Sequence, residues 1–211
     1  MGVAGNLESL LRQIPSSVKL VAVSKFKSEE DIMAAYAAGQ RLFGENRPLE
    51  MEAKAKDLPA DIEWHFIGHL QTNKIKNVLP YASLIESVDS LHLLEAIDAA
   101  AARAGRVVDC LLEVHVAAEQ TKGGFTPEEA VAVAADAASG KYPNIRLRGI
   151  MAMATNTDDR EVVRSDFRRA RQVQIATGLQ ELSMGMSGDW PIAVEEGATI
   201  IRIGSAIFGE R

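Results

Sequence analysis

The sequence predicts an α/β protein in which parallel strands close into a single (β/α)8 TIM-type barrel with an extra N-terminal helix. Short apolar, β-branched runs alternate with helical stretches rich in alanine and charged residues. The alternation occurs eight times, and parallel strands with crossover helices in that number close into a barrel. No linker rich in Pro, Gly or Ser divides the 211 residues, so we expect one domain over residues 1–211. An open, doubly wound sheet is the alternative architecture.

The eight predicted strands are short apolar runs, of which the fifth is the most apolar and the seventh the weakest. They cover residues 19–24, 41–43, 64–67, 83–86, 107–116, 144–151, 181–184 and 199–203. Gly44 is expected to end the second of these strands.

The predicted helices begin or end at residues that are typical of helix termini. They cover residues 3–13, 28–39, 91–104, a stretch that begins at residue 126, and 159–176. Ser28 has Asp31 three positions later, a spacing that favours an N-terminal cap. Thr126 precedes Pro127, which suits the first helical position. Gly39 is expected to stop the helix that Ser28 begins.

Composition and charge argue against several classes of protein. The 29 acidic and 23 basic side chains give a net charge of -6, which argues against a general binder of nucleic acid or membrane surfaces. The single cysteine, Cys110, cannot form an internal disulfide, and the N-terminus has no signal-peptide pattern. No apolar run reaches the roughly 18 residues of a transmembrane helix. We therefore expect a cytoplasmic protein.

Lys25 is the first candidate for chemistry, because parallel α/β folds place functional groups at the carboxyl ends of their strands. It follows the first apolar run, where desolvation and the nearby charge of Lys27 favour the neutral amine. A neutral lysine can form a Schiff base with an aldehyde. The alternative is a solvated lysine at a strand end.

The last two strands offer a phosphate site. Period-two alternation places Arg202 and Gly204 on one face of the last strand, and an arginine that faces the interior needs an acceptor. Gly204 and Ser205 supply backbone N–H groups and a hydroxyl at a helix start, and Ser187 follows the preceding strand. Barrels commonly bind phosphate with the loops after strands seven and eight. Tight strand-to-helix turns are the alternative interpretation.

Together these positions indicate pyridoxal 5'-phosphate (PLP) as the cofactor. Its aldehyde would bond to Lys25, and Arg202 could face its ring nitrogen. Its phosphate would lie on Ser187, Gly204 and Ser205. The G-x-G-x-x-G and G-x-x-x-x-G-K-[ST] patterns do not occur, so a dinucleotide or P-loop site has little support.

Several motifs follow one another along essentially the whole chain. They are VAVSK at 21–25, FGENR at 43–47, WHFIGHLQTNK at 64–74, GIMAM at 149–153, LSMGMS at 182–187 and RIGS at 202–205. In this combination the chain resembles the YggS/PROSC family of pyridoxal phosphate homeostasis proteins. The resemblance implies a barrel like the N-terminal domain of alanine racemase, with Lys25 as the cofactor lysine. It also implies phosphate binding by the serine and glycine positions named above and a ring nitrogen facing Arg202.

The complete set of predicted cofactor-binding residues is Lys25, Asn46, Met186, Ser187, Arg202, Gly204 and Ser205. By the resemblance, Asn46 lies on a loop at the cofactor side. Met186 is one of the methionines that alternate along strands, and we expect these to fill the core or floor the pocket. The chain departs from the family pattern at Phe26, at residues 47–49 (RPL) and at His115. These departures leave the cofactor positions intact.

An arginine at the ring nitrogen argues against an efficient enzyme. PLP accelerates chemistry as an electron sink, and a permanent cation such as Arg202 disfavours protonation of the nitrogen and weakens that sink. A racemase also needs acid–base groups on both faces of its substrate. Alanine racemases supply one from a tyrosine of a C-terminal β domain, which we expect to be absent because this chain ends at Arg211. We therefore predict a protein that binds, buffers or delivers PLP without robust turnover.

Two other classes remain open. A small PLP-dependent racemase or related enzyme could use His65, His69 or His115 as a base, whereas a metal site has no evident third ligand. An interaction module could use the basic turn that contains Lys74 and Lys76. The expected partners are PLP, other B6 vitamers or amino acids, and transiently bound PLP-dependent apoenzymes, but neither nucleic acid nor membranes.

Overall fold

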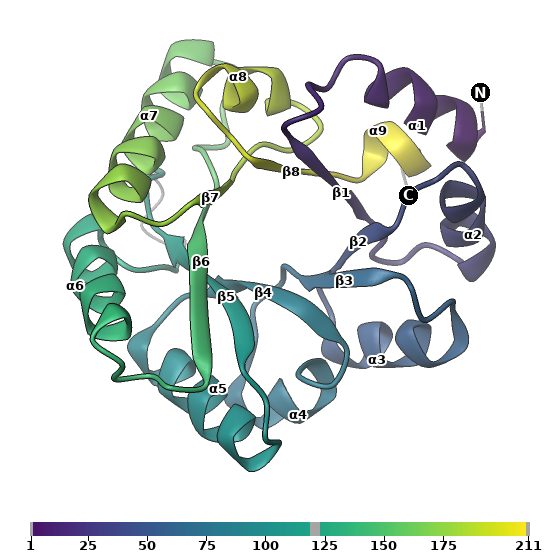
Figure 1. The fold of residues 1–211 in the computed structure, drawn as a ribbon. Coiled ribbons are helices and arrows are strands. Elements are labelled where there is room, and N and C mark those ends of the chain that lie inside the picture. The colour runs from purple at the N-terminus through teal and green to yellow at the C-terminus, as the bar shows by residue number, and fades with distance from the viewer. Residues whose placement is uncertain (1, 119–122, 210–211) are drawn as a thin grey trace.

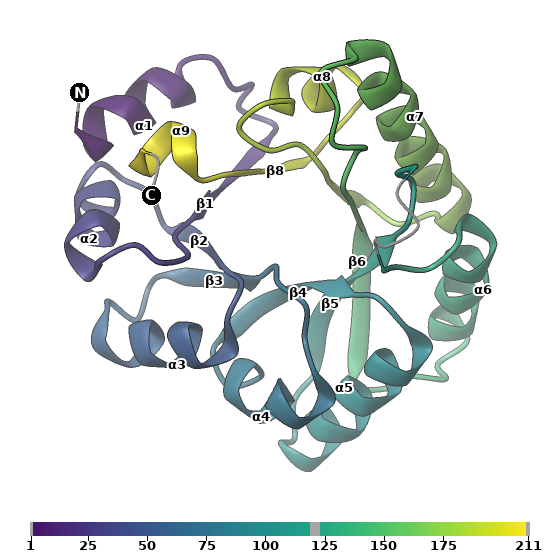
Figure 2. The ribbon, with the colours of Figure 1, turned by 180° about the vertical axis from the view of Figure 1, so that it is seen from behind.

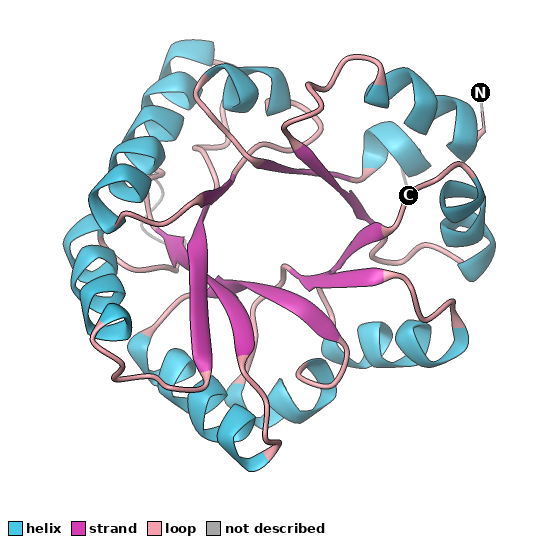
Figure 3. Ribbon diagram, in the orientation of Figure 1, coloured by secondary structure: helices cyan, strands magenta, loops and turns pink. Residues whose placement is uncertain are grey.

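The strands of the computed structural model form a closed barrel with the helices outside it (Figure 1, Figure 3). The structure describes residues 2–118 and 123–209. Each strand pairs in parallel with the next along the chain, and β8 pairs with β1 to close the ring. The closed ring confirms the predicted (β/α)8 barrel and excludes the open, doubly wound sheet.

All eight predicted strands are present, with ends displaced by a few residues. They are β1 (Lys19–Val23), β2 (Leu42–Glu45), β3 (Glu63–Phe66), β4 (Ala82–Val88), β5 (Val108–Val114), β6 (Ile145–Ala152), β7 (Glu181–Ser183) and β8 (Ile200–Ile203). The prediction that Gly44 ends the second strand is wrong, because β2 continues to Glu45, which pairs with Phe66. A Cβ atom on Gly44 would lie 2.7 Å from Cγ1 of Val21, so glycine here permits close packing inside the barrel.

Helices of very different lengths connect the strands. They are α1 (Val3–Leu11), α2 (Glu29–Ala37), α3 (Pro48–Asp57), the 3-10 turn η1 (Thr72–Lys74), α4 (Ile75–Val78), α5 (Leu91–Arg103), α6 (Pro127–Ala138), α7 (Arg160–Thr177), α8 (Trp190–Glu195) and α9 (Ser205–Phe208). Ser28 accepts a hydrogen bond from the backbone N–H of Asp31, and Thr126 forms a capping box with Glu129. Both predicted caps and the extra N-terminal helix are confirmed.

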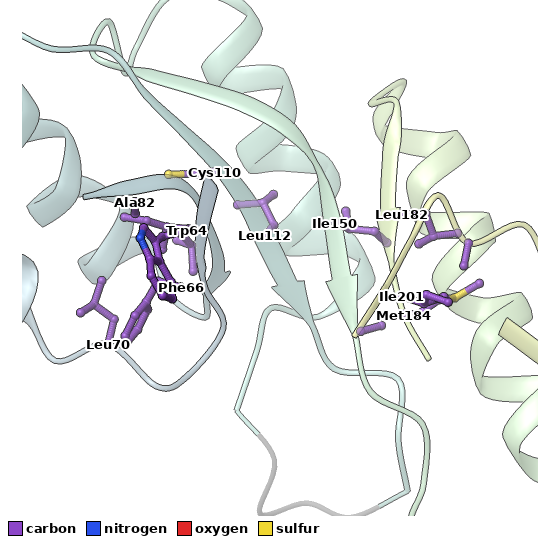
Figure 4. Packing of buried hydrophobic residues seen from close by; sticks show 14 of the residues in the cluster. Trp64, Phe66, Leu70, Ala82, Cys110, Leu112, Ile150, Leu182, Met184 and Ile201 are labelled. Atoms are coloured by element: carbon purple, nitrogen blue, oxygen red, sulfur yellow. The ribbon is translucent and has the colours of Figure 1, made fainter. Parts of the chain in front are cut away.

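Apolar side chains form two layers. The outer layer lies between the strands and the helices, and Figure 4 shows part of it: Trp64, Phe66, Leu112, Ile150 and Leu182. The inner layer fills the barrel: Val21, Leu84, Leu111, Met151 and Ile200. Cys110 belongs to the outer layer, where burial raises the pKa of its thiol, so it is the core residue that its apolar neighbours predict.

The first and last described helices lie side by side next to β1 (Figure 2). The side-chain amide of Asn6 in α1 donates to the carbonyl oxygen of Ile207 in α9 at 3.0 Å. This contact fixes the short helix that follows β8 and therefore the position of Ser205 at its start. Within the described ranges, no helix is long and apolar enough to cross a membrane.

Candidate functional site

A cavity of about 510 Å³ lies at the carboxyl ends of the strands, within the size range of small-molecule sites. All seven residues predicted to bind the cofactor line it, namely Lys25, Asn46, Met186, Ser187, Arg202, Gly204 and Ser205. The remaining lining residues are Val23, Lys27, Ile67, Met153, Gly188 and Gly209. The barrel thus brings residues from both ends of the chain to one cavity.

Lys25 lies two residues beyond the end of β1 at Val23, and its side chain has no hydrogen-bond or ion-pair partner in the described part of the chain. The preceding residue is fixed instead. Ser24 donates from Oγ to Oε1 of Glu45 at 2.6 Å and accepts at its carbonyl oxygen from Nζ of Lys54 at 2.8 Å. Lys54 and Glu45 form a buried ion pair at 2.8 Å. This ion pair holds the backbone beside Lys25 and leaves the amine available to a ligand.

Phe26, on the other side of Lys25, has a left-handed backbone with a φ of 61°. This conformation costs a residue other than glycine about 1–2 kcal/mol. The Phe26 N–H donates to Oε1 of Glu50 at 2.6 Å, and Glu50 also pairs with Lys54 at 2.7 Å. The guanidinium of Arg47 lies 4.2 Å from the centroid of the Phe26 ring. Two departures from the family pattern, Phe26 and Arg47, therefore contact each other beside Lys25.

Arg202 reaches the cavity from inside the barrel, as the alternation along the last strand predicts. Its Nη1 donates to Oγ of Ser183 at 2.5 Å, and its Nη2 donates to the carbonyl oxygen of Ala152 at 3.1 Å. A carboxylate oxygen of Glu86 lies 3.7 Å from Nη1. The interior arginine therefore has the acceptors that its burial requires.

Glu86 of β4 is a fully buried carboxylate. Its Oε1 lies 2.5 Å from Nδ1 of His65, and its Oε2 accepts from Oγ of Ser183 at 2.5 Å. Burial alone would raise the pKa of Glu86, but the hydrogen bond and charge of His65, followed by the charge of Arg202, hold it below its ordinary value. The carboxylate is therefore ionised at neutral pH.

The turn after β7 has a fixed shape. Gly185 has a φ of 94°, and a Cβ atom there would lie 2.6 Å from Cβ of Ala193. Asp189 accepts a hydrogen bond from the backbone N–H of Met186 at 2.6 Å. These two constraints place Met186 and Ser187 at the cavity.

The turn after β8, like the turn after β7, contains glycine and serine and lines the cavity. Gly204 precedes α9, and a Cβ atom there would come within 3.3 Å of the carbonyl oxygen of Val23. In the described part of the chain, the hydroxyls of Ser187 and Ser205 have no hydrogen-bond partner. The first N–H groups of a helix also have no partner within it. These groups can receive an anion.

The cavity is cationic although the chain carries a net charge of -6. Lys25, Lys27 and Arg202 line it, and no acidic side chain does so among the described residues. The side-chain oxygen of Asn46 is buried and has no hydrogen-bond partner among the described residues. An anionic ligand that also carries a hydrogen-bond donor would satisfy these groups.

Two further residues were not predicted as part of a site, namely Lys27, which lines the cavity, and Glu113, which is outside its lining. Lys27 donates to the carbonyl oxygens of Phe208 and Gly209 at 3.2 and 3.1 Å, and so joins the turn after β1 to the end of α9. In β5, burial and then the charge of Asp89 raise the pKa of Glu113 to about 7. Alternation along β5 could have found Glu113, because it places this residue on the inner face together with buried neighbours.

The three histidines considered as alternative bases do not line the cavity. His65 is buried inside the barrel, and His69 is exposed and lies 3.0 Å from Asp89. The strand that would align these two histidines ends at Phe66, so they do not share a strand face. Nδ1 of His115 is buried and has no hydrogen-bond partner within the part of the chain that the structure describes. Within the ranges 2–118 and 123–209, no group of three or more metal-binding side chains occurs.

The fold and the cavity define a (β/α)8 barrel that binds a small molecule at the carboxyl ends of its strands. The family model for the alanine racemase N-terminal domain matches residues 3–211. The pyridoxal phosphate homeostasis protein of Aquifex aeolicus is 41% identical over 202 residues, which cover 92% of this chain and 87% of that protein. The chain belongs to the alanine racemase N-terminal domain family and, within it, to the pyridoxal phosphate homeostasis proteins.

Two solved structures show the same barrel. PipY of Synechococcus elongatus, solved with PLP bound, matches with a TM-score of 0.86 and 38% identity, over 98% of this chain and 100% of that chain. Alanine racemase of Clostridium difficile matches with a TM-score of 0.74 over 100% of this chain and 57% of that chain. At 14% identity, the second likeness shows the fold alone. The predicted family and fold are confirmed.

Proposed function

We propose that this chain binds PLP as a Schiff base on Lys25 and serves intracellular PLP homeostasis, holding the cofactor without robust turnover. One observation carries the proposal: an unpartnered lysine, an arginine and two Gly/Ser turns meet at one cationic cavity. The names of the relatives and the PLP of PipY support it. We also propose that residues 1–211 act as one domain in the cytoplasm, since the single cysteine needs no oxidising compartment.

The residues of the cavity fit the parts of PLP. Gly204 and the hydroxyls of Ser187 and Ser205 would hold the phosphate. Asn46 would offer its unpartnered oxygen to a donor on the ring, with Met186 packed in the same wall. When bound, the cofactor supplies an aldehyde that reacts reversibly with amines.

The same residues favour a protein that holds PLP over a protein that uses PLP to catalyse a reaction. Arg202 is fixed by Ser183 and Ala152, and its permanent charge would disfavour a proton on the ring nitrogen. The three tyrosines lie elsewhere: Tyr36 in α2, Tyr81 before β4 and Tyr142 before β6. An acid–base pair on both faces of a bound amino acid, which racemisation needs, is not built from these residues.

Borohydride reduction tests the Schiff base. PLP added to the purified chain should give a visible absorption band that the reduction bleaches, and peptide mapping should place the label on Lys25. Lys27 is the internal control, because it lines the same cavity two positions away. A label on Lys27, or no label, would contradict the proposal. Lys25→Ala should lose the band and retain weak binding through the phosphate site.

A second measurement separates a carrier from an enzyme. Other B6 vitamers and amino acids are proposed to compete at the cavity, and PLP-dependent apoenzymes are proposed to receive the cofactor in transient contact. Mixing the loaded protein with an apoenzyme should restore that enzyme's activity faster than dilution alone releases PLP. Efficient racemisation of an added amino acid by the purified chain would overturn the carrier assignment.

A further inference from the structure

A chain of hydrogen-bonded side chains crosses the barrel interior between its two ends. His65 lines a second cavity of about 250 Å³ at the amino ends of the strands, and Arg202 lines the cofactor cavity at the carboxyl ends. Glu86 and Ser183 connect them. The three contacts, from His65 to Glu86, from Ser183 to Glu86 and from Arg202 to Ser183, each measure 2.5 Å. The four residues belong to β3, β4, β7 and β8, so the connection spans the barrel rather than one strand edge.

All four side chains are shielded from water. Glu86 and Ser183 are essentially inaccessible, while His65 and Arg202 expose 6% and 5% of their surface. With His65 neutral, the charges of Glu86 and Arg202 cancel. With His65 protonated, the buried group carries one net positive charge. Because the protein interior screens charges weakly, this difference of one charge changes the electrostatic potential at the nearby Arg202 guanidinium.

We propose that His65 and Glu86 are positioning residues for Arg202, and that protonation of His65 from the amino-end cavity reduces how far Glu86 neutralises the charge of Arg202 at the cofactor cavity. Glu86 fixes the guanidinium directly and through Ser183. When His65 is protonated, the negative charge of Glu86 also balances the positive charge of His65. The positive charge of the Arg202 guanidinium is then less fully neutralised. The consequence for bound PLP rests on the proposed function, whereas the coupling between His65 and Arg202 does not.

Other charged groups also face His65 at the amino-end cavity. They are Lys19, Glu63, Asp109, Arg148 and Glu181. Lys19 pairs with Glu181 at 2.6 Å, and Arg148 lies 3.7 Å from Asp109. Among side-chain types, histidine is the one whose ordinary pKa lies closest to neutral pH. The cavity gives His65 a path to solvent protons at the end of the barrel opposite the cofactor.

Nitrogen-15 NMR of the ligand-free protein tests the coupling. The ring nitrogens of His65 and the guanidinium nitrogens of Arg202 should shift with pH at one common midpoint. His65→Gln retains a donor for Glu86 but does not titrate, so the Arg202 response should disappear. His69→Gln is the matched control, because His69 also pairs with a carboxylate but lies outside this group. An Arg202 signal that does not follow His65 in the wild-type protein would overturn the proposal without any variant.

The PLP-loaded protein tests the consequence for the cofactor. Its visible absorption band should change with the midpoint that NMR gives for His65, and His65→Gln should abolish this change. A band that does not respond, despite coupled NMR signals, would refute the influence on the cofactor. If the chain bound no PLP, the ligand-free measurement would still decide the roles of His65 and Glu86. Failure of this inference and failure of the proposed function are therefore distinguishable.

Discussion

Lys54 of α3 donates a hydrogen bond to the carbonyl oxygen of Ser24 at 2.8 Å and so holds the chain at the residue before Lys25. The same ammonium group pairs with Glu45 and Glu50, and Glu50 accepts from the residue after Lys25. One buried lysine outside the cavity therefore fixes both sides of the lysine inside it. The position of the proposed cofactor amine depends on an ion-pair network that never contacts the cofactor cavity.

Lys54→Met should remove this support and lower the free energy of unfolding by about 3–5 kcal/mol, because it leaves Glu45 buried and unpaired. Burial already raises the pKa of Glu45, and Lys54 opposes that effect. Without Lys54, ionising Glu45 destabilises the fold, so the loss should grow from pH 5 to pH 8. Urea unfolding followed by circular dichroism measures it.

Lys56→Met is the control on the same helix. Lys56 pairs with Glu52 at 2.7 Å, but its side chain is 55% exposed, against 8% for Lys54. Its loss should change the free energy of unfolding little, because solvent screens an exposed ion pair. Equal losses in the two variants would show that burial of the Lys54 pair has no special effect.

The double substitution Ser187→Ala and Ser205→Ala should weaken PLP binding about 100-fold, since it removes two hydrogen bonds to a charged group. Pyridoxal has no phosphate, so its affinity should change little. Absorbance titrations of both compounds with the wild-type and variant proteins give the ratio. If the wild-type protein bound pyridoxal and PLP equally well, these serines would not form a phosphate site.

Gly185→Ala should cost about 3 kcal/mol and weaken PLP binding, because the new Cβ atom collides with Ala193 in the turn that carries Ser187. Gly140→Ala is the matched control. Its φ of 86° is as unfavourable for alanine as the 94° of Gly185, but no atom lies within 4 Å of the added Cβ. It should cost about 1 kcal/mol and leave binding unchanged. Thermal unfolding and PLP titration separate the two contributions.

Glu113→Gln should change how stability depends on pH. The folded-state pKa of Glu113, about 7, lies above its ordinary value of 4.5. The stability that the neutral carboxyl contributes is present below pH 4.5 and is lost as the pH rises through 7. The variant should match the wild-type protein at low pH and exceed its stability by about 1–3 kcal/mol at pH 8. Unfolding curves from pH 4 to pH 8 test this, with the exposed Glu95→Gln as a surface control.

The barrel could be predicted from sequence because its strands are local apolar runs and several helices have caps such as Ser28 and Thr126. The short helices α4, α8 and α9 were not predicted, since four to six residues are too few to show a helical period. The ten-residue helix α3 was not predicted either, although Pro48 stands at its start. The prediction that Gly44 ends a strand is wrong because the sequence does not distinguish a glycine that ends a strand from a glycine that makes room for a neighbouring side chain such as Val21.

The cofactor-binding candidates gather at one cavity because each follows a strand or, like Arg202, lies close to the carboxyl end of one, and all carboxyl ends of a parallel barrel lie at one end. The partnership between His65 and Glu86 was not predictable in the same way. It depends on which residues of different strands lie at the same height inside the barrel. The tilt of the strands and the closure of the barrel set this register, and the spacing of residues in the sequence does not.

The closure between β1 and β8, where Ala22 lies opposite Ile203, has a consequence for biosynthesis. A ribosome adds Lys25 long before Ser205, so the amine and the anion-binding turn cannot meet until β8 and the turn after it have been synthesised. The proposed site forms only once β8 has paired with β1. A nascent or truncated polypeptide would therefore release a captured aldehyde that the finished barrel retains.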